Sequence, residues 1–524
     1  MNRITRVARI AIVMAGIAGP ALASAQEPVD LDVIARIREE GFRRSGVMDL
    51  AWYMTDVLGP RLTGSPGLRR AQQWAKSTME SSGLVNATIE PFGEHGVGWT
   101  NEYTSLHLIE PTYQPLIGYP QAFTPGTAGK LSGAAVIVTL RSPADFATYR
   151  GKLKGAIVLA TPPIPAGPRF TADAERFGPD TLAALERVTL ASEFETGGVA
   201  QAWNDVIRTF LPVGSKVTAP GFAEEVLTFF KAEGVGVVLE AGPGGDGTVF
   251  LTGRAGNRQD RSMAGVLASP PVVTLAAEHY NRIYRLASRG IPTKLEVDVR
   301  NQLDNSDTKG YNVLGDWTGT DLKDQLVIVG GHFDSWHAAT GATDDAAGCA
   351  VALEAIRILK AIGVKPRRTI RVAFWSWEEG GVNGSRAYVR NHPELATRLS
   401  GYFGLDAGAG ATRGIYLQGN ERVRPIFQQW IEPLRDLGVT TVTSENQFGV
   451  DAIAFDMAGL PGFQFIQDPM DYETRTHHSN MDVFDKLVPD DLRKNAVVMA
   501  TFLYHAAMRD ALLPREKAES RRLP

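Results

Sequence analysis

From residue 311 to residue 513 the chain alternates between short apolar runs and longer segments with helical periodicity. A bounded apolar run of about four to eight residues is typical of a buried strand, and apolar positions that recur every three to four residues are typical of a helix. Strands are predicted at 326–330, 369–377, 402–405 and 462–466. Helices are predicted at 346–362, 386–391, 423–437, 452–458 and 489–508. This alternation predicts an α/β fold with a mostly parallel sheet and helices on both of its faces.

Two further regions have different patterns. Residues 30–90 are predicted to be largely helical, with a turn-rich break at 60–66 and a last helix at about 67–82. Residues 115–256 are rich in glycine and proline and predict a mainly β module inserted into the larger domain. Its predicted strands are 134–140, 155–160, 235–240 and 248–251.

The first 25 residues have the pattern of a signal peptide. Arg3, Arg6 and Arg9 precede an apolar stretch, and Ala23-Ser24-Ala25 matches a cleavage site. A membrane anchor is the alternative, but the apolar stretch is short and contains Pro20. We therefore expect cleavage after Ala25 and a secreted or periplasmic protein. No other apolar run reaches about 18 residues, so no membrane span is expected in the mature chain.

Composition excludes several classes of protein. The 524 residues are 44% hydrophobic and 21% charged, which is typical of a globular protein. The net charge is −4, and basic residues cluster only in scattered pairs, so nucleic acid is not expected as a partner. The single cysteine, Cys349, rules out an intramolecular disulfide and is expected to be a small buried residue. Neither a Gly-x-Ser-x-Gly elbow nor a phosphate-binding loop is present in the sequence.

Each of the four strands predicted in residues 311–513 is followed by residues that bind metals. The candidate ligands are His332, Asp344, Glu379, Asp406 and His478. In an open α/β sheet, ligands bind beyond the carboxyl ends of the strands, so these side chains are expected to converge. Imidazole nitrogens and carboxylate oxygens bind Zn²⁺ at about 2.0–2.2 Å, and two such ions sit about 3.5–4 Å apart in known two-metal sites. Asp344 is central and is predicted to bridge two ions, with His332 and Asp406 on one, and Glu379 and His478 on the other.

Two neighbouring carboxylates have other predicted roles. Glu378 precedes the ligand Glu379 and is predicted to be the general base. Asp334 follows His332 by two residues and is predicted to accept the other N–H of its imidazole.

Simpler explanations exist for each piece alone. A histidine such as His332 is common in surface turns, and Asp344-Asp345 before an apolar helix is typical of an N-cap. Glu378-Glu379 is typical of a solvated helix start, and His477-His478 of an exposed loop. The occurrence of all of them at four successive strand ends favours the two-metal site.

Several motifs together resemble those of the co-catalytic zinc exopeptidases, which include bacterial leucyl aminopeptidases and glutamate carboxypeptidase. They are His332-x-Asp334-Ser335-Trp336, Gly341-Ala342-x-Asp344-Asp345, Glu378-Glu379-x-Gly381, Asp406-Ala407-Gly408, Gly459-x-Pro461-Gly462, His477-His478-Ser479 and Leu62-Thr63-Gly64-Ser65. The chain is most similar to the carboxypeptidase Q-like members, and the resemblance covers about residues 30–515.

The resemblance implies an exopeptidase domain formed by residues 26–119 and 263–524, interrupted by a protease-associated domain at 120–262. It implies two zinc ions on the five ligands named above, with Glu378 as the base. His477 stands where relatives often have a tyrosine that stabilises the oxyanion, so the same role is expected of it. His337 has no assigned role.

The expected function is a zinc-dependent exopeptidase that hydrolyses short peptides or dipeptides, as carboxypeptidase Q-like proteins do. An aminopeptidase on the same site is the main alternative, because the residues that recognise the substrate terminus lie in loops. A non-catalytic binding protein on a peptidase fold, or a one-zinc acyl-transfer enzyme such as a glutaminyl cyclase, are further alternatives. Whether the chain forms a homodimer stays open.

Overall fold

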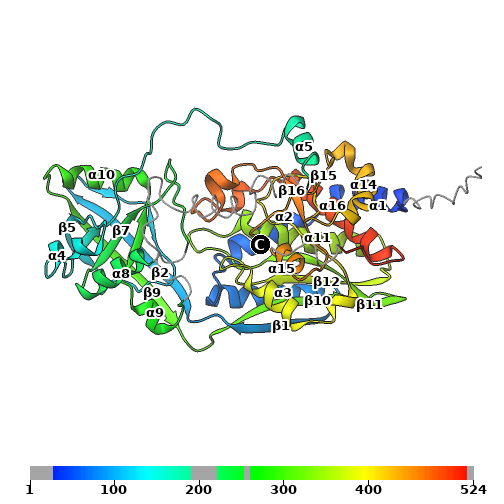
Figure 1. Ribbon diagram of the computed structural model, residues 1–524, viewed down its shortest axis with the longest axis horizontal. Helices are drawn as coiled ribbons and strands as arrows, with labels where there is room; N and C mark the ends of the chain where they lie inside the picture. The colour runs from blue at the N-terminus through cyan, green and yellow to red at the C-terminus, as the bar shows by residue number, and fades with distance from the viewer. Residues whose placement is uncertain (1–26, 190–220, 253–259, 516–524) are drawn as a thin grey trace, which may run out of the picture.

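The computed structural model describes residues 27–189, 221–252 and 260–515, which form a larger and a smaller lobe (Figure 1). Each lobe is built around an eight-stranded sheet. The predicted signal peptide, residues 1–25, lies outside the described residues. Within the described residues, no helix combines the length and the apolar character that crossing a bilayer requires.

The sheet of the larger lobe is parallel at its centre, with antiparallel pairs on both sides of that centre. Its order is β1-β10-β12-β11-β13-β16-β14-β15, and the pairs β12–β11, β11–β13 and β13–β16 are parallel. The strands are β1 (Val85–Glu94), β10 (Lys309–Trp317), β11 (Leu322–His332), β12 (Arg368–Trp375), β13 (Leu399–Gly404), β14 (Thr412–Tyr416), β15 (Thr441–Thr443) and β16 (Gly462–Gln467). The four strands predicted from the sequence are the parallel centre of this sheet, which confirms the predicted α/β fold.

Helices cover both faces of this sheet. Successive side chains on its central strands point to opposite faces, and because both sets are apolar, both faces must be buried. On β11, Val327 and Val329 belong to one core cluster and Leu326 and Ile328 to another. The first cluster contains residues of α1 (Leu31–Arg43), α2 (Val47–Trp52), α3 (Pro66–Ser81), α11 (Ala347–Ala361), α14 (Arg424–Ile431) and α16 (Pro489–Met508). The second contains residues of α12 (Asn383–Asn391), α13 (Leu395–Arg398) and α15 (Ala452–Met457).

Short helical turns connect these elements. They are η1 (Tyr53–Val57), η3 (Ala342–Ala346), η4 (Glu421–Val423), η5 (Glu432–Leu437), η6 (Tyr472–Thr476) and η7 (Phe484–Lys486). The single helix predicted at 423–437 is divided into α14 and η5, and Pro433 stands at the start of η5. Proline lacks the N–H that a continuous helix needs at this point.

The sheet of the smaller lobe has the order β3-β2-β9-β5-β6-β7-β8-β4. Its strands are β2 (Gly98–Glu110), β3 (Gln114–Pro115), β4 (Gly118–Pro120), β5 (Leu131–Ile137), β6 (Ile157–Leu159), β7 (Val237–Ala241), β8 (Val272–Leu275) and β9 (Lys294–Asp304). Its helical segments are η2 (Pro143–Asp145), α4 (Phe146–Tyr149), α8 (Phe222–Ala232), α9 (Met263–Leu267) and α10 (Ala277–Ser288). α8 packs on the face of β7 that carries Val238, and α10 on the face that carries Val237 and Leu239.

The structure of this lobe differs from the sequence predictions in two respects. The prediction of a mainly β module did not include α8, whose apolar stripe faces the sheet. The predicted strand at 248–251 is wrong, because these backbone groups pair with a loop of the larger lobe instead of with a sheet neighbour. Strands β2 and β9 lie outside residues 120–262, so the sheet extends beyond that segment on both sides. The boundaries at 120 and 262, and the identity as a protease-associated domain, stay predictions.

A long connection returns from the smaller lobe to the larger one. After β6 the chain arches across to α5 (Pro179–Glu186), which lies beside β15 (Figure 1). Thr443 of β15 donates a hydrogen bond from its hydroxyl to the carbonyl of Leu185, at 2.5 Å. On the way, Arg176 pairs with the buried carboxylate of Asp468 at 2.9 Å.

Candidate metal centre

The five predicted ligands meet at the carboxyl ends of the parallel strands. His332 is the last residue of β11, and Asp344 lies in η3, which follows it. Glu379 follows β12, Asp406 follows β13, and His478 lies in the loop after β16 and η6. All these strands point the same way, so residues distant in sequence share one edge of the sheet.

Asp344 is at the centre of the cluster. Its Oδ1 lies 2.9 Å from His332 Nε2, and its Oδ2 lies 3.4 Å from His478 Nε2. Asp406 Oδ1 lies 3.5 Å from His332 Nε2, and Glu379 Oε2 lies 2.8 Å from His478 Nε2. The two oxygens of one carboxylate therefore face two different histidines, and each histidine also has a carboxylate of its own.

The buried carboxylates fit a cation. The side chains of Asp344 and Glu379 are 5% and 4% exposed. Asp344 Oδ2 and Glu379 Oε1 accept no hydrogen bond from any described residue. Burial, reinforced by the charge of Asp344, raises the pKa of Glu379 well above its usual range. A carboxylate buried in this way is costly unless a positive charge balances it. The described residues contain three sets of candidate ligand atoms, and within each set the atoms lie within 4.8 Å of one another.

The pKa values of His332 and Asp344 are shifted in opposite directions. Burial lowers the pKa of His332, but the charge of Asp406 and the hydrogen bonds that the ring donates to neighbouring carboxylates raise it well above the usual range. Burial opposes the ionisation of Asp344, but His332 holds the pKa of that carboxyl below its usual range. The site therefore strongly favours a cationic partner for its carboxylates.

Asp334 holds the site together in a different way from the predicted one. His332 Nδ1 lies 2.9 Å from the main-chain carbonyl of Asp334 and 3.7 Å from its carboxylate. The carboxylate accepts hydrogen bonds from the Thr63 hydroxyl at 2.5 Å and from the Glu378 amide at 3.3 Å. A carbonyl at Nδ1 makes that nitrogen the donor and leaves Nε2 free to face the carboxylates.

A tight turn presents Glu378 and Glu379. Trp377, which precedes them, has φ +59°, and the carbonyl of Glu378 accepts hydrogen bonds from the amides of Gly381 at 2.6 Å and Val382 at 2.9 Å. Burial raises the pKa of Glu378 well above its usual range. A carboxylate whose pKa is raised in this way holds a proton more readily than an exposed one.

Asp345 was not singled out from the sequence as a site residue. It is fully buried, and its Oδ1 accepts the amide of Gly348 in the first turn of α11 at 2.9 Å. The helix-capping role considered for Asp344-Asp345 therefore falls to Asp345, while Asp344 faces the histidines. Asp345 also joins His332 and Asp406 in one set of candidate ligand atoms.

The two adjacent histidines have different neighbours. His478 contacts Asp344 and Glu379, whereas His477 Nδ1 lies 3.3 Å from Glu473 Oε2. The rings of His477 and His478 have their centroids 3.9 Å apart, so His477 lies directly beside the carboxylate cluster. Although burial lowers the pKa of His477, Glu473 and Asp344 raise it above the usual value, which suits a hydrogen-bond donor.

Two further residues support the site. Arg61 had no signal in the sequence, whereas Asp482 belongs to the motif His478-x-x-x-Asp482, which also resembles the zinc exopeptidases. Arg61 is completely buried, and its guanidinium donates to carbonyls of the segment between His332 and Asp344. Asp482 accepts hydrogen bonds from the amide and the hydroxyl of Thr343, at 2.6 and 2.8 Å, and so ties the histidine-bearing loop to η3. Both act through contacts between segments far apart in the sequence, which periodicity does not reveal.

His337 and Cys349 lie outside the ligand set. His337 Nε2 is 2.8 Å from the carbonyl of Pro120, and its ring packs edge-on against Trp99, so it joins the two lobes. Cys349 is buried as predicted, with its thiol donating to the carbonyl of His332.

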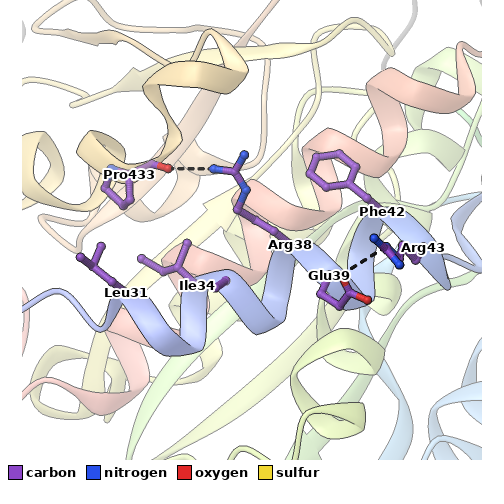
Figure 2. Close-up of a pocket in the computed structure, with 8 residues that line it drawn as sticks. Leu31, Ile34, Arg38, Glu39, Phe42, Arg43 and Pro433 are labelled. Carbon is purple, nitrogen blue, oxygen red and sulfur yellow. Dashed lines mark hydrogen bonds and ion pairs between the residues drawn. The ribbon is translucent and has the colours of Figure 1, made fainter.

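Cavity size does not locate this site. A groove of about 500 Å³ runs along α1 and is lined by Leu31, Ile34, Arg38, Phe42 and Pro433 (Figure 2). It contains none of the predicted site residues. A hollow of only about 10 Å³, the size of one water or small ion, is lined by residues of the site. They are Trp336, Ala339, Gly341, Asp344, Glu379, His478, Ser479 and Asp482.

Comparison with known proteins agrees with this fold. Carboxypeptidase Q of Homo sapiens is 31% identical over 245 residues, which is 47% of this chain and 51% of the human protein. The match thus spans about half the length of that relative. The crystal structure of a peptidase M28 precursor from Shewanella amazonensis has a TM-score of 0.64 at 22% identity and covers 93% of this chain and 98% of its own. A zinc aminopeptidase from Bacillus subtilis has a TM-score of 0.54 at 17% identity and covers 90% and 97%.

A family model matches the part of the chain that holds the cluster. The match to peptidase family M28 extends over residues 312–503 and includes His332, Asp344, Glu379, Asp406 and His478. The chain therefore carries a peptidase family M28 domain in residues 312–503.

Proposed function

We propose that the protein is a zinc-dependent exopeptidase that hydrolyses short peptides or dipeptides. The observation that carries this proposal is the position of Asp344, whose two carboxylate oxygens face His332 and His478 at 2.9 and 3.4 Å. A carboxylate shared between two histidine-containing ligand sets can bridge a pair of zinc ions. The family M28 domain, and the names of the human relative and the Bacillus subtilis structure, support the same reaction class.

The proposed ligand sets follow the contacts within the cluster. His332 and Asp406 would hold one ion, Glu379 and His478 the other, and Asp344 would be shared. Zinc bound there would supply Lewis acidity and lower the pKa of a water molecule toward about 7. Asp334 orients His332 through its main-chain carbonyl, and Asp482 keeps the loop of His478 against η3.

Glu378 is the proposed proton carrier. It is adjacent to the ligand Glu379 but belongs to none of the candidate ligand sets of the described residues, and its raised pKa suits proton transfer. It would take a proton from the attacking water and return it to the leaving amine. His477, beside the carboxylates but paired with Glu473, would donate a hydrogen bond to the oxygen of the tetrahedral intermediate.

The second part of the proposal concerns which end of the peptide the enzyme cleaves. The human relative is named a carboxypeptidase, whereas the Bacillus subtilis structure is that of an aminopeptidase. The sequence similarity favours the carboxypeptidase Q-like activity, and aminopeptidase activity on the same site is the second candidate.

The test is a panel of dipeptides with free, N-blocked and C-blocked termini, applied to the zinc-loaded protein. We expect two zinc ions per chain and hydrolysis that requires one free terminus; which terminus is required separates the two candidates. Glu378→Gln should keep both ions and lower kcat by about 10²–10⁴. The matched variant Glu379→Gln should lose one ion.

Three results would contradict the proposal. A protein that binds no zinc, or one that binds zinc and cleaves no peptide in the panel, is not this enzyme. Loss of zinc from Glu378→Gln with retention in Glu379→Gln would mean that the roles of the two glutamates are exchanged.

A further inference from the structure

The loop that carries His478 is held by the smaller lobe. The smaller lobe sends residues 247–251 alongside this loop, which belongs to the larger lobe. The amide of Leu251 donates to the carbonyl of His478 at 2.7 Å, and the amide of Asn480 donates to the carbonyl of Val249 at 3.2 Å. These two bonds and an isolated antiparallel bridge between Phe250 and Ser479 form a short β-like pairing between the two lobes.

The side chain of Asn480 completes this pairing. Its Oδ1 accepts the amide of Val249 at 2.7 Å, and its Nδ2 donates to the carbonyl of Gly247 at 3.2 Å. An amide side chain offers an acceptor and a donor at once, as a backbone peptide does. Asn480 therefore continues the hydrogen bonding of the loop where its own backbone turns away.

His478 needs such support because of its backbone conformation. Its φ is +57°, in the left-handed region that a residue with a side chain occupies at a cost of about 1–3 kcal/mol. Such a conformation persists only where surrounding contacts hold it. The bond to its own carbonyl and those of Asn480, two residues later, lie next to the strained position.

Ion pairs also link the segment before this loop to the smaller lobe. Arg475 pairs with Asp173 at 2.8 Å and with Asp246 of the smaller lobe at 3.2 Å, and Arg169 pairs with both aspartates. Asp246 is 69% exposed, so salt screens this network and exposed pairs of this kind contribute little. The amide contacts of Asn480 are the better restraint on His478.

We propose that Asn480 is a positioning residue through which the smaller lobe sets the place of His478. The inference rests on the proposed function for the metal that His478 would hold. It adds that completion of the metal site depends on contact with residues 247–251 of the smaller lobe.

The experiment compares Asn480→Ala and Asn480→Asp with Asn301→Ala in the full chain. Asn301 also donates from its side-chain amide to backbone carbonyls, those of Thr124 and Pro125, but within the smaller lobe. The first measurement is hydrogen exchange of the Val249 and Leu251 amides in metal-free protein. The second is zinc affinity by competition with a chelator, together with the melting temperature.

Asn480→Ala should exchange both amides faster and bind one zinc equivalent about 10–100-fold more weakly, the usual effect of removing a group that orients a ligand. Asn480→Asp keeps the acceptor for Val249 and should give an intermediate loss, which also keeps the test usable if the alanine variant does not fold. Asn301→Ala should leave both measurements as in the unaltered chain.

The outcomes separate this inference from the proposed function. Native exchange and native zinc affinity in Asn480→Ala would overturn the inference, and an equal loss in Asn301→Ala would overturn it too. If the unaltered chain binds no zinc, the proposed function fails. Faster exchange of Val249 and Leu251 in Asn480→Ala would still show that Asn480 holds the lobe contact.

Discussion

Replacing Arg61 by methionine tests whether one buried arginine holds the segment between two metal ligands. Arg61 is fully buried, and burial lowers the pKa of its guanidinium. It donates hydrogen bonds to five main-chain carbonyls, those of Phe333 at 2.8 Å, Met54 at 2.9 Å, Thr340 at 2.8 Å, Gly341 at 2.9 Å and Gly59 at 3.4 Å. Three of these carbonyls lie between His332 and Asp344.

The expected magnitude follows from these contacts. Methionine is long enough to fill much of the space but has no donor, so the five carbonyls lose the guanidinium as a partner. An unsatisfied buried polar group costs about 1–3 kcal/mol. Relief of the desolvation of Arg61 offsets part of this loss, so we expect the free energy of unfolding to fall by about 3 kcal/mol.

Urea unfolding of the metal-free protein, followed by tryptophan fluorescence, measures this loss. Arg69→Met is the matched control, because Arg69 is 28% exposed and pairs with Asp307 at 3.1 Å near the surface. It should cost about 1 kcal/mol or less. A loss in Arg61→Met no larger than in Arg69→Met would refute the reasoning, since it would mean that water or backbone shifts satisfy the carbonyls.

The other predictions concern the metal site and pH. Asp344→Asn should weaken the binding of both zinc ions, and metal analysis after dialysis measures this loss. Two tightly bound ions with normal turnover would mean that another residue bridges them. His478→Ala should lose one zinc, whereas His477→Ala should keep both and lower kcat by about 10²–10³ with little change in KM; the reverse pattern of zinc loss would exchange their roles. Burial lowers the pKa of His337 from 6.5 to about 4, so between these values the unfolded chain takes up a proton that the native ring does not. Stability is then present above pH 6.5 and lost as pH falls, and His337→Gln should reduce the fall between pH 7 and pH 5 by about 2 kcal/mol in urea titrations. An unchanged pH dependence in that variant would rule out His337 as its source.

Local sequence pattern was sufficient for the centre of the larger lobe and for the approximate location of its site. The parallel strands are long apolar runs because both of their faces are buried, and such runs are visible without a structure. Residues that follow them must lie at one edge of the sheet, so His332 and Glu379 could be placed together from their positions after β11 and β12. Strand β14 and the edge strand β15 were missed because they are short and adjoin irregular segments.

Tertiary structure decided which neighbouring residue does what. Asp344 and Asp345 have the same chemistry, and only packing places the carboxylate of Asp344 against His332 and that of Asp345 at the first turn of α11. The same is true of the carbonyl of Asp334, which is nearer than its carboxylate to His332. The contacts of Arg61 and Asn480 join segments separated by hundreds of residues, where no local periodicity constrains the partner. A hydrogen bond or charge pair is lost when its atoms move apart by a few tenths of an ångström to an ångström, and its geometry exists only once the distant segments have folded together.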